Sequence, residues 1–202
     1  MKPITAKSFL SQNLVSSLKR RSGYLVNQFM ELACHQGVIH AESSLMEVQF
    51  QPGSLDLRLG KKAHRIQCSF LPENLAVEEK LKDLSLYEID LRDDKGILEK
   101  GAIYLIPLME ELELPSSIYG RTNPKSSTGR LDIFCRTISD YCEEYEVIKL
   151  GYKGKIYLEI TSKTFNVVFK TGDKLNQLRL SNFKTNYIND AVLQKINTRT
   201  PL

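Results

Sequence analysis

The feature that most constrains the fold is an alternating strand with a carboxylate in its middle. Leu158 and Ile160 fall on one face of that strand and Glu159 on the other. The residues around them are mostly apolar, so the strand is expected to be buried. A buried carboxylate is either paired with a cation or used as an acid or base. Arg130 and Lys125 are the candidate partners.

A hydroxyl-rich turn precedes this strand. It reads Asn-Pro-Lys-Ser-Ser-Thr-Gly-Arg over residues 123–130. Its proline fixes one backbone angle and its glycine frees another, so the turn can be sharp. The adjacent hydroxyls of Ser126 and Ser127 lie between the cations Lys125 and Arg130. Together with their backbone N–H groups, these side chains could grip an anion.

The composition is that of an ordinary globular chain. Its 202 residues are enough for one domain with a core, and 42% of them are apolar and 26% charged. The net charge of +4 suits an anionic ligand without requiring nucleic acid. No apolar run approaches a membrane span, and the four cysteines lack zinc-site or small-disulfide spacing. We therefore expect free thiols, a cytoplasmic location, and no nucleic-acid or membrane partner.

Most of the chain predicts an all-β fold with minor helices. Short apolar or alternating runs separated by turn signals, such as Asp-Asp-Lys-Gly at 93–96, favour a β-barrel or jelly roll. The run beginning at Leu55 alternates with polar residues from Asp56 onward and predicts a half-buried strand. The charged run over 75–84 predicts a short exposed helix or loop. Strands are expected over 55–59, 63–70, 86–91, 102–108, 118–122, 133–138, 156–161, 165–169 and 175–180.

Longer helices are expected on either side of these strands. Asn27 is positioned to cap a helix over 27–36, which Gly37 would end. A second helix over 187–196 would be capped by Thr185 or Asn186.

The first 26 residues have a different composition. They contain lysines, arginines and serines but no acidic residue, as transit peptides do. We favour a solvated N-terminal extension, in which a short amphipathic helix fits within 5–18. The expected organisation is this extension over 1–26, a β domain over 27–184, and a C-terminal helix and tail over 185–202.

Four short segments form a combined signature. They are Gln-Pro-Gly-Ser-Leu-Asp-Leu-Arg-Leu-Gly at 51–60, Lys-Ser-Ser-Thr-Gly-Arg-Leu at 125–131, Gly-Tyr-Lys-Gly at 151–154 ahead of the strand that carries Glu159, and Lys-Thr-Gly-Asp-Lys-Leu-Asn-Gln-Leu at 170–178. Each alone is a weak signal, but the four in order are a strong one. They resemble the dCTP deaminases, a branch of the dUTPase-like nucleotide hydrolases. The resemblance implies a dUTPase-like distorted β-barrel or jelly roll.

The same resemblance implies roles for the residues of the turn and the strand. Glu159 would be the general base that takes a proton from the water attacking C4 of cytosine. It would then deliver protons toward the ring nitrogen and the departing ammonia. Ser126 and Arg130 would hold the water and the developing charge. Lys125 and Ser127 would bind the phosphates, although most deaminases have Arg in place of Lys125, which keeps the charge but loses bidentate geometry.

Further residues complete the expected site. Gln177, Arg136 and Tyr152 are assigned to substrate binding, although Gln177 also fits a solvent-facing strand position. Asp56 would brace the barrel or a water network near magnesium, and a structural role is equally consistent. Magnesium would arrive with the triphosphate. His-Ala-Glu at 40–42 matches half of the zinc deaminase motif, but the Pro-Cys-x-x-Cys half is absent, so a zinc-free deaminase is expected.

The sequence also departs from the family pattern. Lys149 stands where dUTPases carry their catalytic Asp, residues 141–146 look like an insertion, and Asp132 replaces the usual Gly. Nothing after Phe183 matches the tail that closes over the triphosphate in short deaminases. These features resemble the first domain of a longer, two-domain bacterial dCTP deaminase, with residues 200–202 near the junction.

The resulting prediction is hydrolytic, zinc-independent deamination of dCTP to dUTP and ammonia, feeding dUMP and dTTP synthesis. By resemblance the protein forms a homotrimer, in which Ser126 and Arg130 act with Glu159 of a neighbour, and dTTP is a candidate inhibitor. One alternative is a dUTP diphosphatase or bifunctional deaminase–diphosphatase. Another is a non-catalytic nucleotide-binding module, or half of a longer enzyme.

Overall fold

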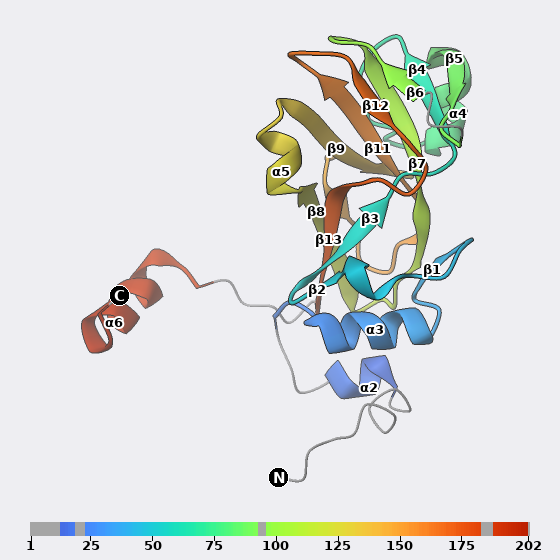
Figure 1. The fold of residues 1–202 in the computed structure, drawn as a ribbon. Helices are drawn as coiled ribbons and strands as arrows, with labels where there is room; N and C mark the ends of the chain where they lie inside the picture. The colour runs from blue at the N-terminus through green and yellow to red at the C-terminus, as the bar shows by residue number, and fades with distance from the viewer. Residues whose placement is uncertain (1–12, 19–22, 93–95, 183–187, 202) are drawn as a thin grey trace.

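The computed structural model describes residues 13–18, 23–92, 96–182 and 188–201. Figure 1 shows a β body with helices packed at one end and a C-terminal helix standing apart from it. Two antiparallel sheets make up most of the body. The predicted fold class, all-β with minor helices, is confirmed.

The larger sheet carries the strand of Glu159. Its strands are β1 (Ile39–Ala41), β4 (Lys62–Ile66), β5 (Ser85–Asp90), β7 (Ile103–Glu113), β9 (Ile133–Ser139) and β11 (Lys153–Ser162). They follow the order β5-β4-β7-β11-β9, and β1 pairs with the C-terminal part of β7. The strand β11 therefore has a neighbour on each side, so its backbone groups are paired along both edges.

The second sheet carries the strand that leads into the hydroxyl-rich turn, whereas β9, which follows the turn, belongs to the larger sheet. Its strands are β2 (Phe50–Gln51), β3 (Ser54–Arg58), β8 (Ile118–Pro124), β10 (Val147–Ile148) and β13 (Lys174–Asn182). They follow the order β10-β8-β13-β3-β2. A separate ribbon pairs β6 (Gly96–Leu98) with β12 (Val167–Phe169).

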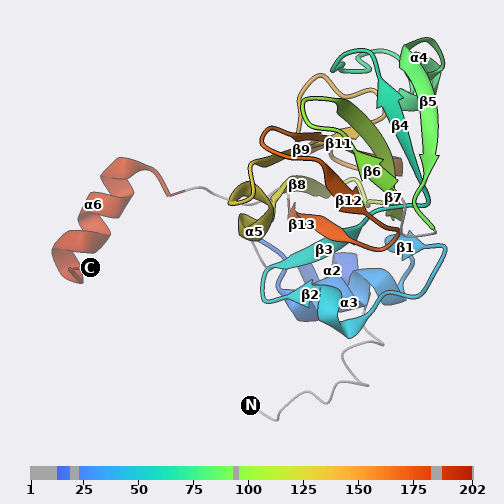
Figure 2. The same ribbon diagram turned by 45° about the horizontal axis from the view of Figure 1, so that its top comes forward.

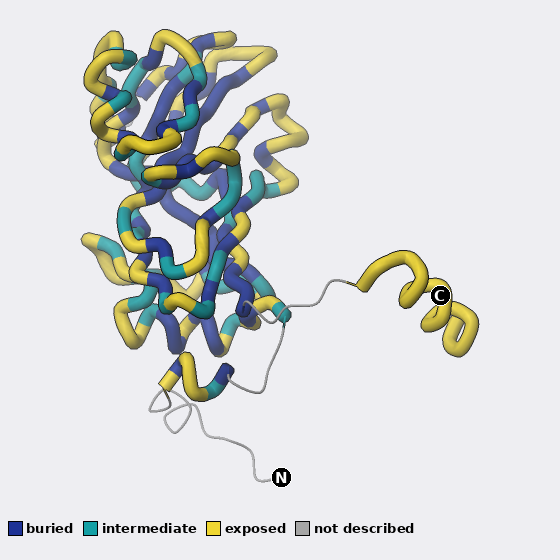
Figure 3. The backbone as a smooth tube through the Cα atoms, turned by 180° about the vertical axis from the view of Figure 1, so that it is seen from behind, coloured by how far each residue is buried: buried dark blue, intermediate teal, exposed yellow. Residues whose placement is uncertain are grey.

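Both faces of β11 are buried, each in a different part of the core. Leu158 and Ile160 join the main core cluster, which also includes Leu55 and Leu178 of the second sheet. The opposite face of β11 contributes Tyr157 to a smaller cluster. Figure 3 shows buried residues along the central strands and exposed ones on the outer loops and the C-terminal helix. Glu159 lies on the same face as Tyr157, so burial of this carboxylate follows from the pleat.

The prediction that β3 is half-buried was wrong, because its polar residues are buried as well. Arg58 and Glu110 form an ion pair with 2.7 Å between Nε and Oε1, and their side chains are 4% and 0% exposed. The Arg58 backbone N–H donates to Glu110 Oε2 at 2.8 Å, and Gln49 Nε2 donates to Oε1 at 2.9 Å. Because the two charged groups are paired and hydrogen-bonded, the free-energy cost of burying them is largely offset.

Helices lie at the edges of the β body, except the C-terminal helix, which stands apart from it. The described ones are α2 (Leu14–Leu18), α3 (Asn27–His35), the 3₁₀ helix η1 (Glu47–Gln49), α4 (Val77–Leu84), α5 (Ser126–Gly129) and α6 (Asp190–Arg199). The hydroxyl-rich turn is thus a short helix, α5, which Figure 2 shows on the opposite side of the body from β4 and β5. The charged run expected to be an exposed helix or loop forms α4, which buries Val77 and Leu81.

Two predicted helix caps were wrong. Val26 occupies the N-cap of α3, and Asn27 is its first helical residue, with Oδ1 accepting from the backbone N–H of Gln28 at 2.9 Å. The C-terminal helix begins at Asp190, later than expected, because Asn189 caps it by accepting from the Val192 N–H at 3.0 Å. The predicted caps Thr185 and Asn186 lie outside the described residues.

The expectation of a solvated N-terminal extension does not hold for its described part. Leu14 and Leu18 of α2 are buried, and so is Leu25. All three belong to the main core cluster. The Leu25 backbone N–H also donates to Leu180 O of β13 at 2.8 Å. Residues just before position 27 are therefore part of the β body, and the domain boundary there stays a prediction.

Several strand boundaries differ from those expected. The strand predicted over 63–70 ends at Ile66, and the one predicted over 165–169 begins at Val167. The strand predicted over 102–108 continues as β7 to Glu113, because the buried pair with Arg58 lets Glu110 lie inside the sheet. Residues 93–95 of the predicted hairpin turn lie outside the described residues.

Candidate active site

The strand β11 holds Glu159 inside the larger sheet, between β7 and β9. Its register partners are Leu105 on β7 and Arg136 on β9. The Glu159 side chain is 4% exposed, whereas that of Arg136 is 45% exposed. A carboxylate in this position is held by two neighbouring strands, so its location depends on the sheet rather than on a loop.

The partner of Glu159 is Arg136, not Arg130 or Lys125 as the sequence suggested. Arg136 Nε and Nη2 donate to Glu159 Oε1 at 3.1 and 2.5 Å. Ser69, in the loop between β4 and α4, donates its hydroxyl to the same oxygen at 3.1 Å. The other oxygen, Oε2, is buried and has no hydrogen-bond partner among the described residues. An unpartnered buried carboxylate oxygen is costly, so it indicates a place for a ligand or water.

The Arg136 guanidinium also lies on an aromatic ring. Its Cζ is 4.0 Å from the centroid of the Tyr145 ring, a cation–π contact. Burial by itself would lower the pKa of Arg136, but the hydrogen bond and the charge of Glu159 outweigh it and raise that pKa. Burial and the Glu159 charge likewise raise the pKa of the Tyr145 phenol. Arg136 is therefore held as a cation and Tyr145 as a neutral ring.

A cavity of about 310 Å³ opens beside this carboxylate. Glu159, Arg136 and Ser69 form its polar wall, and Phe134 and Lys163 form its more exposed side. Gly101, Ile103 and Thr161 complete the lining. The volume lies at the lower end of the range for small-molecule sites, and one wall has a few convergent polar groups, as such sites do.

The second group of predicted residues lies on and next to α5, which connects β8 of the second sheet with β9 of the larger sheet. Ser126, Ser127 and Arg130 are exposed there. Lys125 Nζ forms an ion pair with Asp56 Oδ2, whose side chain is 2% exposed. The buried Thr128 fixes the short helix, because its hydroxyl donates to Leu175 O at 3.0 Å. The cation of Lys125 is thus already partly neutralised within the chain.

Gln177 belongs to this second group. It lies opposite Asp56 on β3 and Asn123 on β8, and its Oε1 accepts from Ser54 Oγ at 3.1 Å. Its side chain is half-buried and hydrogen-bonded, so Gln177 is not simply a solvent-facing polar residue of the strand. Lys125, Asp56 and Gln177 are therefore brought together by strand pairing.

The structure does not bring the two groups together within one chain. Among the described residues, no hydrogen bond or ion pair connects Ser126 or Arg130 with Glu159. The residues that line the cavity beside Glu159 include none from α5.

Tyr152 lies apart from both groups. Its ring is buried, and its hydroxyl donates to Lys155 O at 2.5 Å and accepts from the Asp140 N–H at 3.1 Å. Burial, with a smaller contribution from Asp140, raises the pKa of this phenol. The turn it belongs to places Gly151 and Gly154 at φ angles of 68° and 145°, where a side chain would be strained. In the single chain Tyr152 holds this turn ahead of β11.

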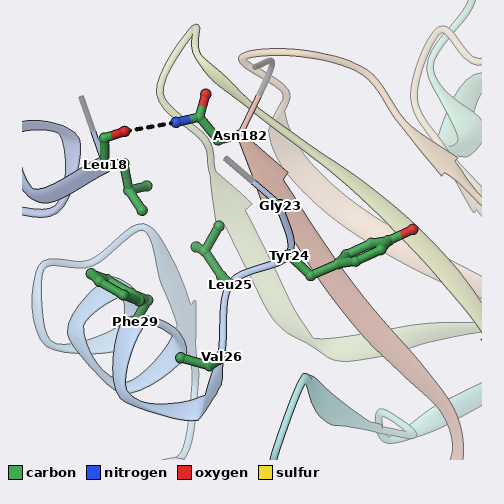
Figure 4. A pocket seen from close by; sticks show the side chains of 7 residues that line it. All are labelled: Leu18, Gly23, Tyr24, Leu25, Val26, Phe29 and Asn182. Atoms are coloured by element: carbon green, nitrogen blue, oxygen red, sulfur yellow. Dashed lines mark hydrogen bonds between the residues drawn. The ribbon is translucent and has the colours of Figure 1, made fainter. Parts of the chain in front are cut away.

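A further cavity of about 310 Å³ lies at the opposite end of the β body, next to α3 (Figure 4). It is lined mainly by apolar side chains, including Leu18, Leu25 and Phe29. Asn182 Nδ2 donates to Leu18 O at 3.0 Å across it. The described residues of the lining include no carboxylate, cation or thiol, so they offer little for catalysis.

Two residues beside Glu159 had no signal in the sequence. Ser69 lies 90 positions from Glu159 and follows a strand that ends earlier than expected. Tyr145 lies in the segment 141–146, which was noticed only as an insertion. One departure is explained by geometry, since Asp132 has a φ of 55° at the position where the family usually has Gly. Its Oδ2 accepts from Thr164 Oγ1 at 2.8 Å.

The described residues contain neither a metal-binding cluster nor a helix suited to span a membrane. Among the described residues, no group of three or more His, Cys, Asp or Glu side chains could hold a metal ion. All four cysteines are described and none is disulfide-bonded. No helix in the described part of the chain has the length and apolar character that a membrane crossing requires.

Fold and site together define a β protein with a buried, arginine-bound carboxylate beside a small polar cavity. Residues 21–184 match the 2'-deoxycytidine 5'-triphosphate deaminase (DCD) N-terminal domain family, and the chain belongs to this family. The crystal structure of 2'-deoxycytidine 5'-triphosphate deaminase from Agrobacterium tumefaciens superposes with a TM-score of 0.84 at 39% identity. The match covers 91% of this chain but 55% of that one, so the chain spans about half of it.

Curated relatives agree with this assignment. A dCTP deaminase of Natronomonas pharaonis is 28% identical over 145 residues, which are 69% of this chain and 69% of that protein. A "dCTP deaminase, dUMP-forming" of Methanosphaera stadtmanae is 29% identical over 132 residues, which are 63% of this chain and 62% of that protein. Some relatives are therefore named dCTP deaminase alone, and others are named as forming dUMP.

Proposed function

We propose that this chain carries a hydrolytic site that converts dCTP and water into dUTP and ammonia. The observation that carries the proposal is the state of Glu159. This buried carboxylate has one oxygen bound by Arg136 and Ser69 and the other oxygen unpartnered, in the wall of a cavity. The family to which the chain belongs supplies the substrate class.

In the proposed reaction Glu159 takes a proton from water, whose oxygen bonds to C4 of cytosine. Glu159 passes this proton to the ring nitrogen and then transfers the proton of the new C4 hydroxyl to the amino group, so that C4 becomes a carbonyl. The C4–N bond then breaks and ammonia leaves. A positioned general base typically contributes about 10²–10⁴-fold to the rate. The anionic state of Glu159, paired with Arg136, is the state that accepts the first proton.

The remaining roles are proposed from the exposed group at α5. Ser126 and Arg130 of a neighbouring copy in a homotrimer would hold the water and the developing charge. Lys125, Ser127 and Gln177 would bind the triphosphate, and dTTP would compete there as an inhibitor. Magnesium fits as a companion of the triphosphate, held by phosphate oxygens and water, because the described residues offer no carboxylate cluster for it.

The main alternative is a bifunctional enzyme that releases dUMP and pyrophosphate, and some relatives are named as dUMP-forming. The residue at the position of the dUTPase aspartate argues for dUTP as the product. Lys149 there is exposed, and its Nζ donates to Tyr141 O at 2.7 Å. A cation in this place cannot act as the base for a second hydrolysis. The other alternative, a binding module or half of a longer enzyme, follows from the coverage of the Agrobacterium chain.

The test measures ammonia, dUTP, dUMP and pyrophosphate separately after incubation with dCTP and magnesium. Wild type is compared with Glu159→Gln, which keeps the shape of the side chain and removes the base. We expect kcat to fall about 10²–10⁴-fold. Glu113→Gln is the matched control, because Glu113 is an exposed glutamate on the neighbouring strand β7.

Each outcome separates the proposals. Turnover to dUTP that is lost only in Glu159→Gln supports the deaminase. Stoichiometric dUMP and pyrophosphate favour the bifunctional enzyme. Binding of dCTP by wild type without turnover overturns the proposal for this chain and leaves the binding module or half-enzyme.

A further inference from the structure

The carboxylate of Glu159 is held unevenly, with every described partner on one oxygen. Arg136 Nε, Arg136 Nη2 and Ser69 Oγ all bind Oε1. Arg136 Nη2 also donates to Ser69 Oγ at 3.1 Å, which closes a triangle around that oxygen. A base that must exchange protons repeatedly benefits from one fixed oxygen and one free oxygen, because the fixed one sets the direction of the other.

We infer that Tyr145 and Ser69 are positioning residues, which fix Arg136 and Oε1 so that Oε2 of Glu159 is the oxygen that exchanges protons. The inference rests on the proposed function, in which Glu159 is the base. It assigns a task to the segment 141–146, which the family pattern does not account for.

The Arg136 side chain needs such fixation. It is 45% exposed and belongs to a flexible residue type, so the ion pair alone does not define one orientation. The Tyr145 ring, 4.0 Å from Arg136 Cζ, covers the guanidinium. The ring and the carboxylate together leave the arginine little freedom to rotate away.

The segment that supplies Tyr145 is itself tied to both sides of the site. The Tyr145 hydroxyl donates to Phe70 O at 3.3 Å, next to Ser69 in the chain. The Glu146 backbone N–H donates to Thr137 O at 2.9 Å, next to Arg136. Tyr141 and Glu146 have φ angles of 58° and 64°, an uncommon conformation that closes the segment at both ends. These hydrogen bonds and backbone angles give segment 141–146 a defined conformation that holds the Tyr145 ring in place.

The test compares Tyr145→Leu, Tyr145→Phe and Ser69→Ala in steady-state assays with dCTP. We expect Tyr145→Leu and Ser69→Ala to lower kcat about 10- to 100-fold with little change in KM, because the base is misdirected while the phosphate-binding residues at α5 stay in place. Tyr145→Phe keeps the ring and should recover most of the loss. Tyr141→Leu is the matched control, because it changes an exposed tyrosine of the same segment. Thermal melting identifies any variant that fails to fold.

The outcomes distinguish this inference from the proposed function. An active wild type whose kcat survives both Tyr145→Leu and Ser69→Ala overturns the positioning role alone. An inactive wild type overturns the proposed function, and a crystal structure of Tyr145→Leu then decides the inference. Arg136 displaced from Oε1 supports it, and Arg136 still bound to Oε1 in that crystal overturns it.

Discussion

The two regions that carry predicted site residues differ in how complete each is within one chain. Around Glu159 the carboxylate is buried and held by Arg136 and Ser69. At α5, Ser126 and Arg130 are exposed and are not among the residues that line this cavity. The region around Glu159 therefore forms a cavity wall within one chain, whereas the region at α5 presents its polar groups to solvent.

The difference follows from how much folding free energy each group costs when the chain is alone. A buried carboxylate without a cation destabilises folding by several kcal/mol, so Glu159 needs its partner from its own sheet. An exposed serine or arginine stays hydrated, so it costs little folding free energy without a protein partner and stays available to contact a second copy of the chain. A buried, internally paired carboxylate and exposed, hydrated groups at α5 are what we expect of a site shared between copies, with α5 of one copy facing Glu159 of the next.

The largest expected effect tests that sharing directly. Arg130→Ala and Glu159→Gln should each lower kcat at least about 100-fold when purified alone. Co-expressed in equal amounts with different tags, they should regain about a quarter of wild-type activity in a closed ring, since that share of interfaces pairs two intact residues. Steady-state turnover of dCTP by the mixed oligomer is the measurement.

A second mixture supplies the control for this experiment. Ser126→Ala and Arg130→Ala alter the same short helix, so every interface in their mixture has one damaged residue and no recovery is expected. Absence of recovery in the Arg130→Ala and Glu159→Gln mixture as well would contradict the shared site. The two regions would then have to meet within one chain.

A smaller effect is expected at Lys125, where a structural and a binding role overlap. Lys125→Met should raise KM for dCTP about 10-fold, the loss of one charged hydrogen bond to phosphate. It should also lower the melting temperature, because Asp56 is left as a buried charge without its partner. The double variant Lys125→Met with Asp56→Asn should recover stability but not KM. Recovery of both would assign Lys125 to the fold alone.

Much of the fold was accessible from the sequence, because local pattern and tertiary environment agreed there. The alternation around Leu158 and the apolar run of β7 predicted strands where the sheet has them. The prediction for β3 failed because alternation cannot distinguish an exposed polar face from one whose charges are paired inside. Glu110, Arg58's partner, lies 52 positions away, so that pairing has no local signal.

The site was accessible in part for a similar reason. Glu159 could be singled out because a carboxylate in an apolar strand needs an explanation. Its partner was misassigned, because Arg136 becomes its neighbour only through the register of β9 against β11. Ser69 and Tyr145 approach from loops whose positions depend on tertiary packing, so no spacing rule could have found them.

The smallest expected effect is at Glu146, next to the region around Glu159. Burial raises the pKa of this carboxyl above its ordinary 4.5, and the nearby Arg136 offsets only part of that shift. The folded protein therefore binds this proton more tightly than the unfolded chain, so Glu146 favours folding in acid and disfavours it as pH rises through the raised pKa. Glu146→Gln should melt slightly higher than wild type at neutral pH, and the difference should vanish below about pH 4. A variant that instead melts lower than wild type at neutral pH, with the deficit shrinking toward acid, would mean that Arg136 outweighs burial and that this second carboxylate stabilises the region around Glu159.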